Sequence, residues 1–438
     1  MWPKPRCLSA PPHSTVGEAT AARETIATGT HRDFAWGFVA QAFSSATNFA
    51  LAVVAGRVLG PAGLGVVVVG FGAYQLVAGL QRAIVMQPLI ADAAPRNAIE
   101  RRRLAESGLA IVACSGIVAT FVVAVVGVGV AGDVGRGLLI IAPWLVAALL
   151  QEFWKAILFQ ERRGAAGAAS DCVRFSVMAV SIPVALAWKH DYVVVGGWGL
   201  GAVAGLAVGF ACFPGRPQRL RAAFSVWRER AWGLGRWLAA REIVFQLFAY
   251  ATVLILAAIL GANGLGGLRA AEALFSPFSL VAAALVLPAL PALSRAATAS
   301  HRGARQLAFR ICAVAVGFGF IYMVVMALIG PWLLVGLFGE RFSRFTDLVW
   351  PMAAVQLLNA AGVSFTLLLM AEMRGRASLV AGVAASAATF ACATGLALGY
   401  GVQGAAWGMA AGSGVGSVAV VYLAVRGRVN SGEIRLMR

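Results

Sequence analysis

Charged residues are scarce in this 438-residue sequence, and their scarcity indicates the class of protein. Asp, Glu, Lys and Arg together make up 12% of the chain, whereas hydrophobic residues make up 60%. The mean hydropathy of +0.81 lies well above the range of soluble domains, in which charged residues make up about 25%. A chain of this composition needs lipid as its solvent, so we predict an integral membrane protein.

Cysteine and histidine are also sparse, and neither is grouped. The six cysteines are scattered singly with no CxxC pair, and the four histidines fall in the first residues or in polar connections. Metal sites and redox-active pairs need such residues at short, regular spacing. We therefore expect no metal, no cofactor and no catalytic residue.

Hydrophobic stretches long enough to cross about 30 Å of hydrocarbon recur along the whole chain, with only short polar segments between them. The first 33 residues are polar and lack an apolar core, so we expect a disordered tail and not a signal peptide. We predict an all-α polytopic membrane protein of about twelve transmembrane helices, at residues 34–57, 64–90, 105–131, 138–159, 172–188, 193–213, 241–261, 267–293, 310–335, 347–371, 378–399 and 404–425.

The net charge of +18 lies mostly on one side of these predicted spans. Arginine and lysine are concentrated in the first 33 residues, in the connections that follow the even-numbered spans, and after residue 425. We assign Arg174 to one of these connections. The opposite connections hold only Arg57, Arg136, Lys189, Arg341 and Arg344. By the positive-inside rule, both termini lie in the cytoplasm. Nucleic-acid binding is not expected, because the connections are too short to fold a recognition module.

An internal repeat divides the chain into two halves. Residues 59–65 read LGPAGLG and residues 260–266 read LGANGLG, 201 positions later. A glycine ladder at four-residue spacing, residues 197–209, recurs 207 positions later at residues 404–416. Duplication of six spans gives two halves of the same orientation around a pseudo-twofold axis along the membrane normal.

The repeat predicts the domain organisation, with the substrate path between the halves. We expect a cytoplasmic tail at 1–33, an N-terminal six-helix bundle at 34–213, a basic cytoplasmic linker at 214–240, a C-terminal six-helix bundle at 241–425 and a tail at 426–438. The linker includes an amphipathic stretch that we expect to lie on anionic lipid at the inner interface.

Two segments resemble a known family. Residues 55–80, AGRVLGPAGLGVVVVGFGAYQLVAGL, resemble the first hairpin of polysaccharide and O-antigen flippases, and residues 399–408, GYGVQGAAWG, resemble their penultimate loop. These flippases belong to the multidrug, oligosaccharidyl-lipid and polysaccharide (MOP) exporter superfamily, and the likeness covers essentially the whole chain after residue 33. It implies a MATE-like pair of six-helix bundles around a central, often cationic cavity. It also implies export of an undecaprenyl-diphosphate-linked oligosaccharide across the bacterial cytoplasmic membrane for surface polysaccharide biosynthesis.

Two other functions are alternatives to the flippase. A cation-coupled multidrug exporter on the same scaffold commonly uses membrane carboxylates, including an acidic residue in the first span, and span one here contains no Asp or Glu. A membrane enzyme such as a glycan polymerase or ligase places catalytic residues in a large external loop, whereas the longest polar connection here, 214–240, lies on the cytoplasmic side. We therefore expect that this protein is not an enzyme.

Charged residues at membrane depth cost roughly 2.5–3.5 kcal/mol each, so each one needs a reason. Arg82 in span two has no acidic neighbour at helical spacing and is a candidate clamp for a diphosphate; otherwise it pairs with a carboxylate on another span or reaches toward the cytoplasmic interface. Arg269 and Glu272, and likewise Glu152 and Lys155, are three residues apart. In each pair, either the two charges simply neutralise each other, or the carboxylate holds the cation toward the cavity until the anionic lipid displaces the carboxylate.

Neutral polar residues within the spans complete the predicted cavity. Gln41 and Asn48 in span one and Asn359 in span ten could hydrogen-bond sugar hydroxyls, although hydrogen bonds between helices are at least as common for such residues. The expected partners are the lipid-linked glycan and membrane lipids, and we expect the protein to act as a monomer.

Overall fold

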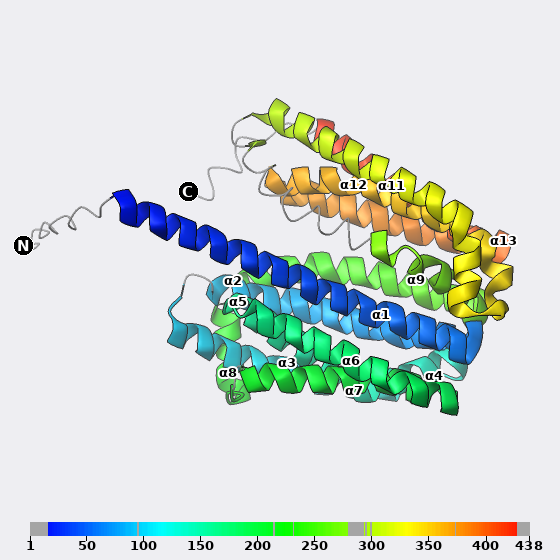
Figure 1. Ribbon diagram of the computed structural model, residues 1–438, viewed down its shortest axis with the longest axis horizontal. Coiled ribbons are helices and arrows are strands. Elements are labelled where there is room, and N and C mark those ends of the chain that lie inside the picture. The colour runs from blue at the N-terminus through cyan, green and yellow to red at the C-terminus, as the bar shows by residue number, and fades with distance from the viewer. Residues whose placement is uncertain are drawn as a thin grey trace, which may run out of the picture.

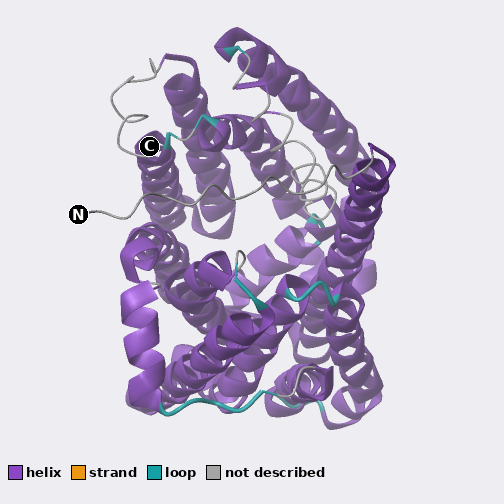
Figure 2. Ribbon diagram, turned by 90° about the vertical axis from the view of Figure 1, so that its left-hand side faces the viewer, coloured by secondary structure: helices purple, strands orange, loops and turns teal. Residues whose placement is uncertain are grey.

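The computed structural model consists of helices joined by short loops (Figures 1 and 2). It describes residues 16–93, 96–212, 215–230, 232–278, 293, 296, 297, 300–372 and 374–426, and within these ranges no residue belongs to a strand. In the same ranges, nine helical segments are long and apolar enough to cross a membrane.

The helices fall into two halves joined by a short helix. The first half comprises α1 (Val16–Gln81), the π-helical turn η1 (Arg82–Met86), α2 (Gln87–Ala93), α3 (Ala98–Gly129), α4 (Gly132–Ile141), η2 (Ala142–Trp144), α5 (Leu145–Gln160), α6 (Gly164–Trp188) and α7 (Asp191–Cys212). The linker forms α8 (Leu220–Arg230). The second half comprises α9 (Trp232–Ala273), α11 (His301–Phe338), η3 (Glu340–Leu348), α12 (Val349–Ala371) and α13 (Gly375–Arg426).

Three of the long helices are hairpins of two helices joined at a glycine. Gly60 in α1, Gly261 in α9 and Gly401 in α13 have φ values of 76°, 68° and 60°, a conformation that glycine adopts without steric cost. In α13, for example, Gly408 beyond the turn packs against the backbone of Cys392 before it. With these three hairpins divided, the nine segments give twelve helical arms at the places of the twelve predicted spans, of which the eighth is described over residues 262–278 and at residue 293.

The two halves form separate groups of helices that meet at one end (Figure 1). The helices of the first half lie below and α11, α12 and α13 lie above, with α9 between them. The most extensive contact between the halves is made by α1 and α9. The groups diverge away from the end that carries the turns at Gly60, Gly261 and Gly401, which we call the turn end.

The backbone repeats itself at the spacing of the sequence repeat. Gly60 and Gly261, 201 positions apart, have nearly the same φ and ψ (76° and −174°; 68° and 170°). Gly132 and Gly339 also share a positive φ, 79° and 96°, and they are separated by 207 positions, the same offset as the glycine ladders. Equivalent turns thus need glycine at equivalent places, as expected of a duplicated six-helix unit.

The element boundaries differ from the prediction at the first helix and at the linker. Helix α1 begins at Val16, so the expectation of a disordered tail over 1–33 is wrong for residues 16–33. After Pro12 this stretch contains no proline, and Ala, Glu and Arg, all good helix formers, supply eight of the residues 16–33. Helix α9 begins at Trp232, inside the predicted linker. Residues 1–15 and 427–438, the outer parts of the predicted tails, lie outside the described residues.

Candidate functional site

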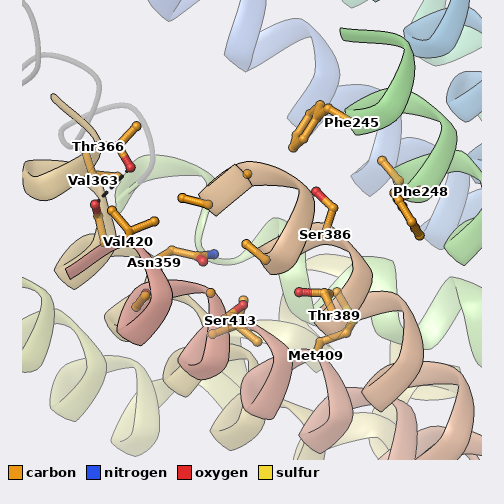
Figure 3. A pocket seen from close by; sticks show the side chains of 18 of the residues that line it. Phe245, Phe248, Asn359, Val363, Thr366, Ser386, Thr389, Met409, Ser413 and Val420 are labelled. Atoms are coloured by element: carbon orange, nitrogen blue, oxygen red, sulfur yellow. Dashed lines mark hydrogen bonds between the residues drawn. The ribbon is translucent and has the colours of Figure 1, made fainter. Parts of the chain in front are cut away.

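A cavity of about 460 Å³ lies within the second half (Figure 3). Helices α9, α12 and both arms of α13 form its walls, and the rings of Phe245 and Phe248 line the α9 side. Its polar lining is mostly neutral, with the amides of Gln356 and Asn359 and the hydroxyls of Thr252, Thr366, Ser386, Thr389 and Ser413 among others. Glu272 is the charged residue among those described as lining it.

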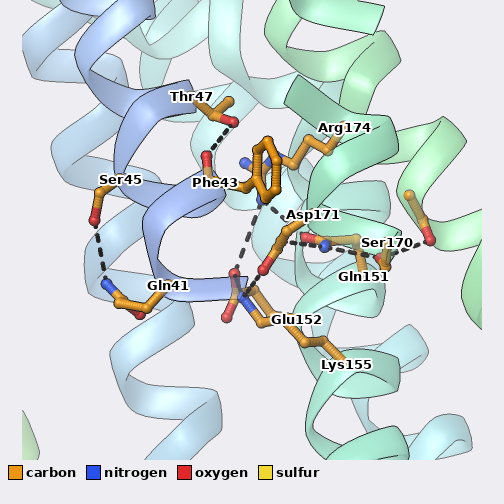
Figure 4. A network of polar contacts seen from close by, with 11 residues as sticks. Gln41, Phe43, Ser45, Thr47, Gln151, Glu152, Lys155, Ser170, Asp171 and Arg174 are labelled. Carbon is orange, nitrogen blue, oxygen red and sulfur yellow. Dashed lines mark hydrogen bonds and ion pairs between the residues drawn. The ribbon is translucent and has the colours of Figure 1, made fainter. Parts of the chain in front are cut away.

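A cluster of charged side chains lies inside the first half, between α5 and α6 (Figure 4). We call Gln151, Glu152, Lys155, Asp171 and Arg174 the charge cluster. Lys155 Nζ lies 3.0 Å from Glu152 and 3.3 Å from Asp171, and Arg174 Nη1 lies 3.8 Å from Glu152. Gln151 accepts a hydrogen bond of 2.8 Å from Arg174 and donates one of 3.0 Å to Asp171. Two carboxylates and two cations therefore neutralise each other in a connected network.

An aromatic pair packs against Arg174 of the charge cluster. The guanidinium of Arg174 lies 4.8 Å from the centre of the Trp198 ring, and the Trp198 ring packs edge-on against Tyr74 at 5.1 Å. The side chains of Asp171 and Arg174 are 0% and 3% exposed. Because breaking a buried pair leaves an uncompensated charge, each member depends on the others.

Three of the five residues of the charge cluster, Gln151, Asp171 and Arg174, are not among the site residues predicted from the sequence. The prediction that Arg174 belongs to a basic cytoplasmic connection is wrong, because α6 begins at Gly164 and carries Arg174 into the buried interior. A hydropathy window delays the predicted start of a helix when charged residues lie near its end. The available signal was the three-residue spacing of Asp171 and Arg174, the same as that of Glu152 and Lys155.

Arg82 lies at the first residue of the π-helical turn η1 and is half-buried. It has no ion pair or hydrogen bond with any described residue, although its charge acts on Glu152 and Tyr74. A π turn inserts one residue into a helix and redirects the side chains around it, and such turns are frequent at functional sites. Arg82 is thus a guanidinium with no protein partner among the described residues, near the charge cluster.

Arg269 and Glu272 form the expected ion pair, at 2.9 Å, on the second arm of α9. Arg269 lines a small pocket together with Asn48, Val68 and Phe71, all of them residues of α1. Glu272 instead lines the cavity of the second half. The pair therefore connects the boundary between the halves with that cavity.

The remaining predicted residues occupy different places. Asn359 lines the cavity of the second half with Glu272. Gln41 is exposed on α1 and donates a hydrogen bond of 3.3 Å to Ser45 on the next turn, without reaching the charge cluster (Figure 4). The structure thus brings Asn48 next to Arg269, and leaves Gln41 apart from the other predicted residues.

The halves are in close contact at the turn end. A Cβ atom at Gly65 would overlap the carbonyl oxygen of Ala262, and a Cβ atom at Gly266 would overlap the carbonyl oxygen of Pro61. Further along the same arm of α1, Gly79 packs against the side chain of Gln246 on α9. The boundary between the halves is closed at this end.

The sequence matches no protein-family model and no curated protein. The structure is similar to solved transporters. An inward-facing conformation of a multidrug resistance MATE family transporter of the MOP superfamily gives a TM-score of 0.71 at 13% identity, over 87% of this chain and 94% of that chain. Lipid II flippase MurJ in an inward closed conformation gives 0.64 at 12% identity, over 88% and 86%. An outward-facing conformation of a MATE family transporter gives 0.55 at 14% identity, over 89% and 93%.

These likenesses define the class of protein by its fold. The chain is an all-α polytopic membrane protein with a MATE-like arrangement of two pseudo-symmetric six-helix bundles, as the sequence predicts. The inward-facing MATE structure superimposes on the chain with a higher TM-score than the outward-facing one, 0.71 against 0.55. Membership of the O-antigen flippases stays a prediction.

Proposed function

We propose that this protein is a flippase that moves a diphosphate-linked oligosaccharide lipid outward across the bacterial cytoplasmic membrane by alternating access. Two observations together support this proposal: a cation without a partner among the described residues, and a cavity whose lining suits a sugar. Arg82 has no ion pair with a described residue, and the cavity of the second half has a lining of hydroxyls, amides and aromatic rings.

The lining of the cavity has the chemistry that binds sugars. Amide and hydroxyl groups both donate and accept hydrogen bonds, as sugar hydroxyls do. The rings of Phe245 and Phe248 offer flat apolar faces to the carbon face of a sugar ring. A volume of about 460 Å³ falls within the range of small-molecule sites, about 300–1,000 Å³. We infer that part of the glycan occupies this cavity.

We infer that Arg82 binds the diphosphate of the molecule whose glycan occupies the cavity. Gly79, one helical turn before Arg82, contacts Gln246 on α9, and the neighbouring Phe245 lines the cavity. A guanidinium binds phosphate oxygens through two parallel hydrogen bonds. Arg269 could add a second contact after release from Glu272. The isoprenoid chain stays in the bilayer throughout.

The transport cycle follows from the closed turn end. In this conformation substrate enters from the side opposite the turn end, which the positive-inside rule assigns to the cytoplasm. Separation of Gly65 from Ala262 and of Gly266 from Pro61 would open the path outward. We propose that the protein acts as a monomer, with the path between its own two halves.

A cation-coupled multidrug exporter is the second candidate function, and one observation favours it. Span one has no carboxylate, but Glu152 and Asp171 place two carboxylates inside the first half from α5 and α6. Such groups can carry a coupling proton or cation. Against this function, both carboxylates are engaged with Lys155 or Arg174, which suits a structural role.

Transport by purified protein in proteoliposomes distinguishes the two functions. One substrate is a polyprenyl-diphosphate-linked oligosaccharide with a fluorophore on the glycan, followed by quenching from one side; the other is ethidium under a proton or sodium gradient. We expect protein-dependent movement of the glycan lipid and no accumulation of ethidium. Gradient-driven ethidium transport without glycan-lipid movement would select the exporter.

A further inference from the structure

A second cavity, of about 800 Å³, lies at the junction of α1, α3 and the linker helix α8. Helix α3 lines it with one continuous face that includes Ile111, Val118 and Val122, and α8 adds Leu220, Arg221 and Phe224. Val118 and Val122 are more than half exposed, at 57% and 51%, so the cavity is open along its side. We call it the linker groove.

The dimensions of the linker groove match a single lipid chain. The lining positions on α3 run from Ile111 to Val123, which at 1.5 Å per residue is a length of roughly 18 Å. One leaflet of the hydrocarbon core is about 15 Å deep. The groove begins beside α8, and its lining positions on α3 continue through the middle of the predicted span 105–131, with an almost wholly apolar surface.

The only charged residue among those described as lining the groove lies at its α8 end. Arg221 has no ion pair or hydrogen bond with a described residue. Helix α8 is basic, with Arg219 immediately before it and Arg228 about two turns after Arg221. A guanidinium at the end of an apolar channel matches a phosphate at the end of an acyl chain.

Hydrogen bonds hold α8 in place at both ends, so the groove is built into the fold. Before α8, Gln218 accepts a hydrogen bond of 2.9 Å from the hydroxyl of Ser107 on α3. Near its end, the indole N–H of Trp227 donates a hydrogen bond of 2.9 Å to the carbonyl oxygen of Ile84 in the π turn η1. Trp227 is only 8% exposed. The wall that α8 contributes is therefore fixed to both α3 and η1.

We infer that the linker groove binds one acyl chain of an anionic phospholipid of the cytoplasmic leaflet, with its phosphate on Arg221. The isoprenoid chain of the transported lipid is a poorer match, because that chain must follow its head group between leaflets, whereas the described lining of the groove offers a cation only at its α8 end. The bound phospholipid would hold α8, and through Trp227 the π turn that carries Arg82. This site does not depend on which substrate the protein transports.

Photo-crosslinking in nanodiscs tests the inference. The nanodiscs contain phosphatidylcholine and a minor fraction of phosphatidylglycerol with a diazirine midway along one chain; a phosphatidylcholine probe with the same chain provides the comparison. Mass spectrometry then maps the labelled peptides. We expect the phosphatidylglycerol probe to label residues 111–123 of α3 more than the phosphatidylcholine probe does.

Two variants with matched controls show whether the groove binds the probe. Arg221→Gln should reduce labelling of α3 by phosphatidylglycerol about five-fold, whereas Arg228→Gln, on the same helix but outside the groove lining, should not. Ala119→Trp fills the groove and should abolish the labelling. Ile117→Trp, on the same helix but facing outward at 61% exposure, should leave it unchanged.

Three results would overturn the inference. The first is equal labelling by the two probes, and the second is labelling of α3 that survives both Arg221→Gln and Ala119→Trp. The third is loss of labelling on addition of a polyprenyl phosphate but not of unlabelled phosphatidylglycerol, which would assign the groove to the isoprenoid chain. Because the readout is labelling and not transport, failure here leaves the proposed flippase function untouched.

Discussion

Gly65 packs directly against the carbonyl oxygen of Ala262, across the boundary between the two halves. The reciprocal contact, Gly266 against the carbonyl oxygen of Pro61, is related to it by the repeat, since each residue lies 201 positions from its counterpart. The pseudo-twofold axis therefore passes close to this pair of contacts. They fasten the first hairpin of each half to the other at the turn end, where the outward path must open.

Gly65→Ala is expected to weaken this closed boundary. The new Cβ atom would overlap backbone, which cannot rotate away, so we expect a cost of about 1–3 kcal/mol to the closed conformation. Spin labels at Ala62 and Asn263, both exposed at the turn end, would report longer distances after the six native cysteines are replaced. Gly317→Ala is the control, because a Cβ atom there meets nothing within 4 Å. Unchanged distances in Gly65→Ala would show that the contact does not hold the halves together.

Mutual neutralisation in the charge cluster can be tested by comparing the stability of a single variant with that of a double variant. Lys155→Leu leaves Asp171 and Glu152 buried with one cation fewer, and we expect a loss of about 3–5 kcal/mol. Lys155→Leu/Asp171→Asn removes one charge of each sign and leaves Glu152 with Arg174, so it should recover much of that loss. Denaturant unfolding in detergent measures both. A double variant no more stable than the single one would contradict a mutually neutralised cluster.

The cavity of the second half predicts selective effects on glycan binding. Asn359→Leu keeps the branched shape of the side chain but removes the amide. We expect the glycan-lipid concentration at half-saturation to rise about ten-fold, for a lost hydrogen bond of roughly 1.5 kcal/mol. Ser386→Trp should block the cavity. Val380→Trp, 57% exposed and outside the lining, is the matched control. If the Ser386→Trp and Val380→Trp variants transport equally well, the glycan does not enter this cavity.

The electrical driving force gives a prediction that needs no variant. An inside-negative potential favours outward movement of a diphosphate head group that carries about two negative charges, by about 2.3 kcal/mol per charge per 100 mV. A potassium diffusion potential of that sign should therefore speed outward flipping and raise the outer-leaflet fraction. A rate that ignores the potential but follows a proton or sodium gradient would instead indicate coupling through Glu152 or Asp171.

The features that could be predicted from the sequence are those that depend on local composition and repetition. Hydrophobic length gave the membrane helices, and the two LGxxGLG segments located the turns at Gly60 and Gly261 and the duplication. The ion pairs of Glu152 with Lys155 and of Arg269 with Glu272 followed from helical spacing.

The features that could not be predicted depend on contacts between distant segments. Ile84, in the π turn that begins at Arg82, accepts a hydrogen bond from Trp227, which lies 143 residues later in the sequence. No local sequence pattern predicts this contact. The burial of Asp171 and Arg174 depends on Gln151 and Lys155 from another helix. Whether a charged residue near a predicted helix end is buried or solvated is decided by such partners and not by hydropathy.

The flipping rate of the Arg82→Gln variant tests most directly whether Arg82 binds the diphosphate. The assay uses the fluorescent polyprenyl-diphosphate oligosaccharide in proteoliposomes, with Arg57→Gln, exposed at the turn end, as the control. Hydrogen bonds to a charged group are worth roughly 1.5–3 kcal/mol, so we expect a rate about ten- to a hundred-fold lower for Arg82→Gln and an intermediate rate for Arg82→Lys. A rate for Arg82→Gln equal to that of the Arg57→Gln control would contradict the central claim.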